Sequence, residues 1–185
     1  EGKKIDSLAD LKGKKVAVGA AGSGTEANAR QILEAAGITY DDINVQYLSF
    51  SEAANNLKDG NIDAAFVTAG FPTAAVQDIA AQRKVKLLNV DDVLADKLIE
   101  KYPFYVKTVI PADTYNGMTE DVKAVAVMSM LAVNSDLDED IVYNLLKTMY
   151  ENPDRLKAAH SLGALIKAET GQDGMSIDQI GRAHV

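Results

Sequence analysis

The chain has 185 residues, of which 47% are hydrophobic and 25% charged, with a formal net charge of −8 and an isoelectric point near 4.7. This composition is typical of a globular protein, and the acidic balance argues against a nucleic-acid-binding surface. Cysteine is absent, which excludes disulfides, thiolate catalysis and zinc–thiolate sites. No apolar run approaches the roughly 18 residues of a membrane-spanning helix.

The first hundred residues alternate between strand-like and helix-like patterns. Apolar runs predict strands at residues 15–18, 43–48, 62–67 and 85–90. Helical spacing predicts helices at residues 25–36, 51–58, 72–82 and 93–101, with Pro72 in the first turn of the third. Because short connections separate these elements, we predict an α/β fold whose mostly parallel sheet is flanked by helices on both faces. Right-handed crossovers would place all the loops after the strands at one edge of that sheet.

The rest of the chain does not continue this alternation of strands and helices. Two prolines flank an extended segment at residues 104–110, and a turn-rich piece follows up to residue 121. A strand is predicted at residues 123–133, and Ser135-Asp-Leu-Asp138 opens an amphipathic helix. The apolar face of that helix comprises Ile141, Leu145, Leu146 and Met149.

The glycine-rich turn GAAGSGTEA at residues 19–27 follows the first strand and leads into the first helix. It is not a P-loop, because Thr25 and Glu26 stand where the lysine and its following hydroxyl residue belong. Residues 22–27 match the loose G-x-G-x-x-A dinucleotide pattern, but the second strand lacks the acidic residue that holds the ribose. Ser23 and Glu26 also have the spacing of a capping box, which forms without any ligand.

The loops that follow the second and third predicted strands resemble the glycine-rich turn after the first. Ser49 and Ser51 follow the second predicted strand, and Thr68-Ala-Gly-Phe-Pro72 follows the third. Small residues, hydroxyl groups and helix N-termini therefore meet at one sheet edge, where the positive ends of helix dipoles favour an anion. In open α/β sheets, ligands bind at this edge.

Catalytic groups are scarce. The two histidines, His160 and His184, lie far from the strand ends, and Ser23 has no partner base in the sequence. No cluster of histidines and acidic residues has metal-ligand spacing. We therefore predict a binding protein rather than an enzyme, with no metal and no cofactor.

Three motifs together resemble one family. AVGAAGSGTEANARQILEAAG, LKDGNIDAAFVTAGFP and YPFYVKTVIP are similar to the TAXI family, the extracytoplasmic solute-binding receptors of TRAP (tripartite ATP-independent periplasmic) transporters. The resemblance covers about residues 6–160. It implies a two-lobed, type II periplasmic-binding-protein-like fold, with the second lobe complete and the first lobe partial.

The resemblance also implies a division of the chain. Residues 1–9 would be a hinge segment, 10–103 the ligand-binding lobe, 104–122 the return hinge strand and connection, and 123–178 part of the first lobe. We expect the sequence to be truncated at both ends relative to this family. Residues 180–185, IGRAHV, match the translation of a common sequencing adapter, so residues 179–185 are expected to be foreign; the alternative is a genuine polar tail.

The function implied by the resemblance is capture of a small carboxylate, a glutamate-like amino acid or a 2-oxo acid, in the periplasm and its delivery to TRAP membrane subunits. The turn from Gly22 to Thr25 would bind the ligand carboxylate, and Phe71 would offer an apolar wall. The full set of expected ligand-binding residues is Gly22, Ser23, Gly24, Thr25, Ser49, Phe50, Ser51, Thr68, Ala69, Gly70, Phe71 and Pro72. No arginine lies at these strand ends, so neutral donors and helix dipoles would carry the charge.

Two alternatives remain open from the sequence. The effector domain of a LysR-type transcriptional regulator shares this fold and binds its ligand in a similar way. A nucleotide-binding enzyme is a weaker alternative, because the loops show no base. We expect neither nucleic-acid binding nor direct membrane insertion by the chain itself.

Overall fold

The computed structural model describes residues 4–172 and 175, which form two compact units. The first unit comprises the described residues up to Tyr102 together with Lys107–Ala126. The second comprises Pro103–Val106 and the described residues from Val127 onward. Each unit is considered by itself below.

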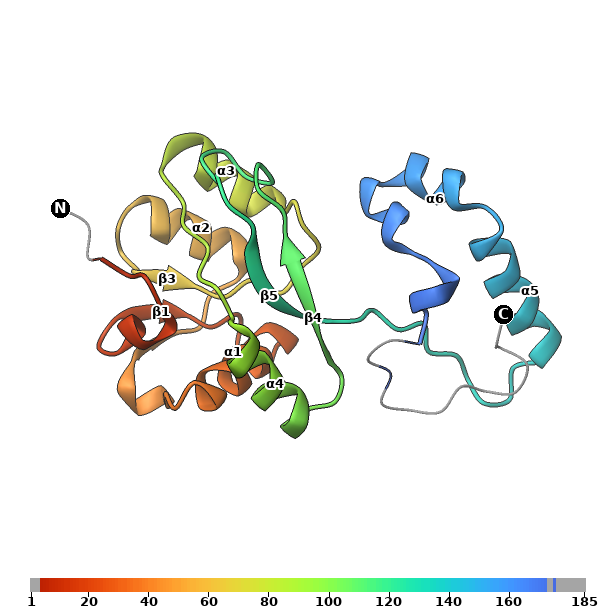
Figure 1. Ribbon diagram of the computed structural model, residues 1–185, viewed down its shortest axis with the longest axis horizontal. Coiled ribbons are helices and arrows are strands. Elements are labelled where there is room, and N and C mark those ends of the chain that lie inside the picture. The colour runs from red at the N-terminus through yellow and green to blue at the C-terminus, as the bar shows by residue number, and fades with distance from the viewer. Residues whose placement is uncertain (1–3, 173–174, 176–185) are drawn as a thin grey trace. The chain divides into compact units, whose positions relative to one another are not determined.

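A three-stranded parallel sheet in the order β2–β1–β3 organises the first unit (Figure 1). Its strands are β1 (Lys15–Ala17), β2 (Asn44–Gln46) and β3 (Ala64–Ala65). Val16 lies opposite Val45 on one side and Ala64 on the other. The parallel arrangement and the first three strands confirm the prediction, although each strand is shorter than expected.

Helices cover both faces of this sheet, as predicted. They are α1 (Gly24–Ala35), α2 (Phe50–Lys58), α3 (Ala74–Gln82) and α4 (Asp92–Lys101). Helix α1 contacts α4, and α2 contacts α3 (Figure 1). Because side chains alternate along an extended chain, Val16 of β1 and Val18 directly after it pack with the core that includes Leu33 of α1, whereas Ala17 packs with Ala53 of α2.

Local sequence explains where α1 begins and ends. The Ser23 hydroxyl oxygen accepts a hydrogen bond from the Glu26 amide at 3.2 Å, which is an N-cap. Ala29 and Leu33 lie one turn apart on the same face and are fully buried. Gly37 has a φ of +73°, the left-handed conformation that ends helices at low cost for glycine.

Three predicted boundaries in the first unit are wrong. Residues 85–90 form no strand: the Val90 amide donates to the Lys123 carbonyl at 2.9 Å, but the Lys123 amide donates at 2.8 Å to the Asn89 side chain rather than to a backbone carbonyl. The strand predicted at 123–133 is β5 (Val122–Val127), and residues 128–133 have no strand pairing. Pro72 follows a cis peptide bond and precedes the N-cap Thr73, so it lies outside α3.

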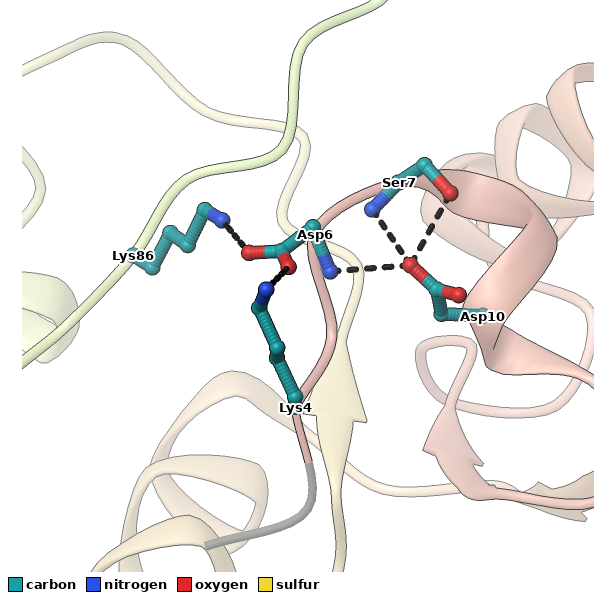
Figure 2. A network of polar contacts seen from close by, with 5 residues as sticks. All are labelled: Lys4, Asp6, Ser7, Asp10 and Lys86. Atoms are coloured by element: carbon teal, nitrogen blue, oxygen red, sulfur yellow. Dashed lines mark hydrogen bonds and ion pairs between the residues drawn. The ribbon is translucent and has the colours of Figure 1, made fainter.

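A network of charged side chains joins the start of the chain to the segment between α3 and α4 (Figure 2). The Asp6 carboxylate pairs with Lys86 and, at 3.1 Å, with Lys4. The Asp10 carboxylate accepts hydrogen bonds from the amides of Asp6 and Ser7, both at 2.9 Å, at the start of the 3₁₀ turn Leu8–Leu11. These bonds lower the pKa of Asp10.

The second unit contains α5 (Glu139–Tyr150), α6 (Pro153–Ala159) and two 3₁₀ turns, Ser161–Leu165 and Ala168–Thr170. The α5 helix confirms the prediction of an amphipathic helix in this region, and its N-cap is Asp138. Its expected apolar face is partly covered, since Ile141 is 55% exposed and Leu145 is 45% exposed, while Leu146 and Met149 are half-buried.

The extended segment predicted at 104–110 is strand β4 (Tyr105–Ile110), which pairs with β5. The connection after it returns to α3, because Tyr115 and Met118 are buried against Val76 and Ala80. Among residues 4–172 and 175, no helix has the length and apolar character needed to cross a bilayer. The suspected adapter sequence, residues 179–185, lies outside the described residues.

Substitutions at two residues of α4 test how much core packing contributes to the free energy of unfolding. Leu98 is completely buried, whereas Val93 on the same helix is 80% exposed. We expect Leu98→Ala to lower the free energy of unfolding by about 2–5 kcal/mol, because it leaves a cavity as well as losing apolar burial. Val93→Ala should change it by less than about 0.5 kcal/mol, and urea unfolding followed by circular dichroism measures both. Equal losses in the two variants would contradict the packing of α4.

Candidate functional site

The carboxyl ends of the three parallel strands meet at one edge of the sheet, as predicted. Beyond β1, the Gly19 carbonyl accepts the Leu48 amide at 3.2 Å, which continues the β1–β2 pairing into the loops. On the other side, the Phe66 amide donates to the Ala17 carbonyl at 2.8 Å. The loops at residues 19–25, 47–51 and 66–73 therefore leave the sheet side by side, and none of them contains a charged residue.

The first loop folds tightly around Gly19. This residue has a φ of +103°, and a Cβ added to it would lie 2.8 Å from Cβ of Thr25. Gly22 also has a positive φ, +72°, and the Ser23 amide donates to the Ala20 carbonyl at 3.0 Å. This turn brings Gly22, Ser23, Gly24 and Thr25 together at the N-terminus of α1.

Thr25 is buried in the first turn of α1, with 7% of its surface exposed. Its side chain lies against Gly19, and its hydroxyl group has no hydrogen-bond partner among residues 4–172 and 175. Buried hydroxyl groups are normally hydrogen-bonded, so this one requires an explanation. The N–H groups of Gly24 and Thr25 also have no acceptor inside α1, because the first amides of a helix never do.

The capping box predicted between Ser23 and Glu26 is only half formed. Ser23 caps the helix, but the Glu26 carboxylate does not return to the Ser23 amide. It accepts hydrogen bonds instead from Arg30 Nη2 at 2.5 Å and from the Tyr40 hydroxyl at 2.9 Å. The Arg30 guanidinium lies 5.1 Å from the Tyr40 ring centroid, a cation–π contact.

The contacts among Glu26, Arg30 and Tyr40 shift the pKa values of all three side chains. The hydrogen bond from Arg30 lowers the pKa of Glu26 despite its burial, and it raises the pKa of Arg30. Burial is the main cause that raises the pKa of Tyr40 to about 12, with its hydrogen bond to Glu26 adding to the effect. At neutral pH Glu26 is therefore ionised and Tyr40 is neutral.

The second loop has a complete capping box. Ser49 Oγ accepts from the Glu52 amide at 3.4 Å, and Glu52 Oε2 accepts from the Ser49 amide at 2.8 Å. Ser49 Oγ and Ser51 Oγ lie 3.4 Å apart. Ser49 and Ser51 are exposed and Phe50 is half-buried at the beginning of α2.

A side-chain hydrogen bond ties the third loop to α1, the helix that follows the first loop. Asn28 Nδ2 on α1 donates to Thr68 Oγ1 at 3.2 Å. Ala69, Gly70 and Pro72 are exposed, and the Gly70 carbonyl accepts from the Thr73 hydroxyl at 2.7 Å. Phe71 is partly buried against the core of α3 and Tyr115, so only part of its ring is available as an apolar wall.

Sequence inspection missed four residues around this edge. Asn28 and Tyr115 hold the third loop, since the Tyr115 hydroxyl oxygen accepts the Thr73 amide at 3.0 Å. Arg30 and Tyr40 redirect Glu26. Only the i,i+4 spacing of Glu26 and Arg30 was visible as a signal; the other contacts join residues distant in the chain.

Comparison with known proteins shows the family to which the chain belongs. Residues 1–178 match the NMT1-like family, so the chain belongs to the NMT1-like family, a family of periplasmic solute-binding proteins. These are binding proteins rather than enzymes, which confirms the prediction that the chain is not an enzyme. TAXI membership within this class stays a prediction.

The fold is similar to a solved structure of the same class, the crystal structure of the periplasmic aliphatic sulphonate binding protein SsuA from Escherichia coli. The TM-score is 0.52 at 20% sequence identity, and the match covers 94% of this chain and 48% of that one. The predicted periplasmic-binding-protein-like α/β fold is thereby confirmed. The chain spans about half the length of that protein.

The tight turn of the first loop can be tested with two glycines. Gly19→Ala should destabilise the fold by about 1–3 kcal/mol, because φ is positive and the new Cβ would overlap Thr25. Gly24→Ala should change stability by less than about 1 kcal/mol, because nothing lies within 4 Å of its added Cβ. Thermal unfolding distinguishes them, and a neutral Gly19→Ala would contradict the turn geometry.

The ionised Glu26 should make stability depend on pH. Its folded-state pKa lies below the usual 4.5, so its stabilising effect is complete above about pH 4.5 and is lost as the pH falls through the lowered value. The difference in free energy of unfolding between wild type and Glu26→Gln should therefore shrink below pH 4.5. Urea unfolding between pH 7 and pH 3 measures it, and a difference that stays constant would disprove the ionised pair.

Proposed function

We propose that the chain is the ligand-binding part of an extracytoplasmic solute-binding receptor that captures a small carboxylate at the carboxyl edge of the β2–β1–β3 sheet. The observation that carries this proposal is the buried Thr25 hydroxyl, which lacks a partner within the described residues. It lies in the first turn of α1, beside amides that have no acceptor inside the helix. An anion that accepts from these donors would satisfy all of them.

The residues in the three loops at this sheet edge indicate the chemical class of the ligand. The three loops contain no lysine or arginine, so the negative charge would be balanced by helix N-termini and neutral donors. Motif similarity to the TAXI family favours a glutamate-like amino acid or a 2-oxo acid. The similar structure, SsuA, is named for aliphatic sulphonates, another class of small organic anion, so a sulfonate belongs in the test.

The proposed ligand contacts are the residues expected from the sequence. The turn Gly22–Thr25 would hold the carboxylate, and the loops Ser49–Ser51 and Thr68–Pro72 would line the same cleft. The Asn28–Thr68 hydrogen bond supports a shared role for the third loop and the first turns of α1, because it fixes the loop to the helix. The closed Ser49–Glu52 box supports a lesser role for α2 in binding an anion, since a carboxylate already occupies its first turn.

A receptor of this type would close on its ligand with two lobes and then deliver it to the membrane subunits of a TRAP transporter. We assign residues 10–103 to the ligand-binding lobe, 104–122 to the hinge connection and 123–178 to part of the other lobe. Membership of a periplasmic solute-binding family favours this function over a transcriptional regulator.

Calorimetry on the full-length protein that contains this chain tests the proposal, with L-glutamate, 2-oxoglutarate and ethanesulfonate as probes. We expect at least one carboxylate to bind. Gly24→Asp places a carboxylate at the open N-terminus of α1, where nothing lies within 4 Å of the new Cβ. It should weaken carboxylate binding about tenfold or more by charge repulsion.

Gly24→Asn is the matched control, because it has the same size without the charge. It should bind within about threefold of the wild type. Both variants should keep the wild-type melting temperature or exceed it, since Asp and Asn are tolerated in the first turn of a helix. Absence of binding to every probe, or unchanged carboxylate affinity in Gly24→Asp, would overturn the proposed site; preference for ethanesulfonate would overturn its ligand class.

A further inference from the structure

The same four-residue pattern begins two helices of the first unit and has two different outcomes. Ser23-Gly-Thr-Glu26 begins α1, and Ser49-Phe-Ser-Glu52 begins α2. At α2 the Glu52 carboxylate lies 2.8 Å from the Ser49 amide and 2.7 Å from the Ser49 hydroxyl, so it covers the start of its helix. At α1 the Glu26 carboxylate turns away, to Arg30 and Tyr40.

The group that holds Glu26 is built from two directions. Arg30 reaches back from the next turn of α1, and Tyr40 comes from the 3₁₀ turn Tyr40–Asp42 before β2. The Tyr40 hydroxyl also donates to the Glu26 carbonyl at 3.3 Å, so it contacts both the backbone and the side chain of Glu26. Glu26 is only 7% exposed, and a buried carboxylate is tolerated when it is paired and hydrogen-bonded in this way.

The turn before α1 makes this diversion possible. The Ser23 amide donates to the Ala20 carbonyl at 3.0 Å, so it already has the acceptor that Glu52 supplies to Ser49 in α2. The first turn of α1 is therefore capped without a carboxylate. Its remaining donors, the amides of Gly24 and Thr25 and the buried Thr25 hydroxyl, stay available beside an uncharged loop.

We propose that Arg30 and Tyr40 are positioning residues for the anion site, because they hold the Glu26 carboxylate away from the N-terminus of α1 and neutralise it. This inference rests on the proposed function. A carboxylate placed at this helix end, as Glu52 is at α2, would repel an anionic ligand. Arg30 therefore favours anion binding without touching the ligand, which accounts for an anion site whose loops carry no cation.

A double-mutant cycle on the full-length protein tests this role, with L-glutamate and 2-oxoglutarate as calorimetric probes. Arg30→Met frees Glu26 and should weaken binding about fivefold or more. Glu26→Gln should leave affinity within about twofold of the wild type, and Arg30→Met/Glu26→Gln should restore it to that range. A purely structural role for Arg30 predicts no such rescue.

Two further variants complete the design. Arg83→Met removes an exposed arginine at the end of α3 and should leave affinity unchanged. Tyr40→Phe removes one hydrogen bond from Glu26 while keeping Arg30, so it should weaken binding less than Arg30→Met and provides the test if Arg30→Met fails to fold. In the ligand-free Arg30→Met protein, carbon NMR of the Glu26 carboxyl should show an altered titration.

The outcomes separate the inference from the proposed function. If the wild type binds neither acid, the proposed function fails and this inference fails with it. If the wild type binds but Arg30→Met and Tyr40→Phe bind equally well, only the positioning role is overturned. Weakened binding that Glu26→Gln does not rescue would also overturn it.

Discussion

The parallel pairing of β1 between β2 and β3 is the interaction on which the rest of the first unit depends. It places the three following loops at one edge, and backbone hydrogen bonds such as Leu48 to Gly19 extend that alignment beyond the strands. It also divides the packing, because Val16 and Val18 face α1 while Ala17 faces α2. The candidate site is thus a consequence of strand order rather than of any single motif.

The position of each glutamate carboxylate near that edge depends on which hydrogen-bond donors bind it. Two helices begin with serine and glutamate at the same spacing, yet one glutamate caps its own helix and the other is bound by an arginine and a tyrosine. The difference arises because Tyr40 lies close enough to reach Glu26 and because Ala20 already accepts the Ser23 amide. Of these two helices, α1 is the one whose N-terminus is not covered by its own glutamate carboxylate.

The second unit contributes differently from the first. The expected apolar face of α5 includes Ile141 and Leu145, which are about half exposed. The chain spans about half of the length of a similar periplasmic binding protein, and it belongs to a family of periplasmic solute-binding proteins.

The sequence by itself determined the α/β class, the order of the first helices and strands, and the three loops at one edge, because apolar periodicity and capping residues act locally. Residues 85–90 show the limit: their pattern is strand-like, but the Asn89 side chain replaces the backbone in accepting the Lys123 amide. Only the tertiary structure decided that Thr25 is buried with no hydrogen-bond partner for its hydroxyl group within residues 4–172 and 175, and that Glu26 leaves its capping box. Both depend on residues brought close by folding, Gly19 against Thr25 and Tyr40 against Glu26, and such contacts have no local signature.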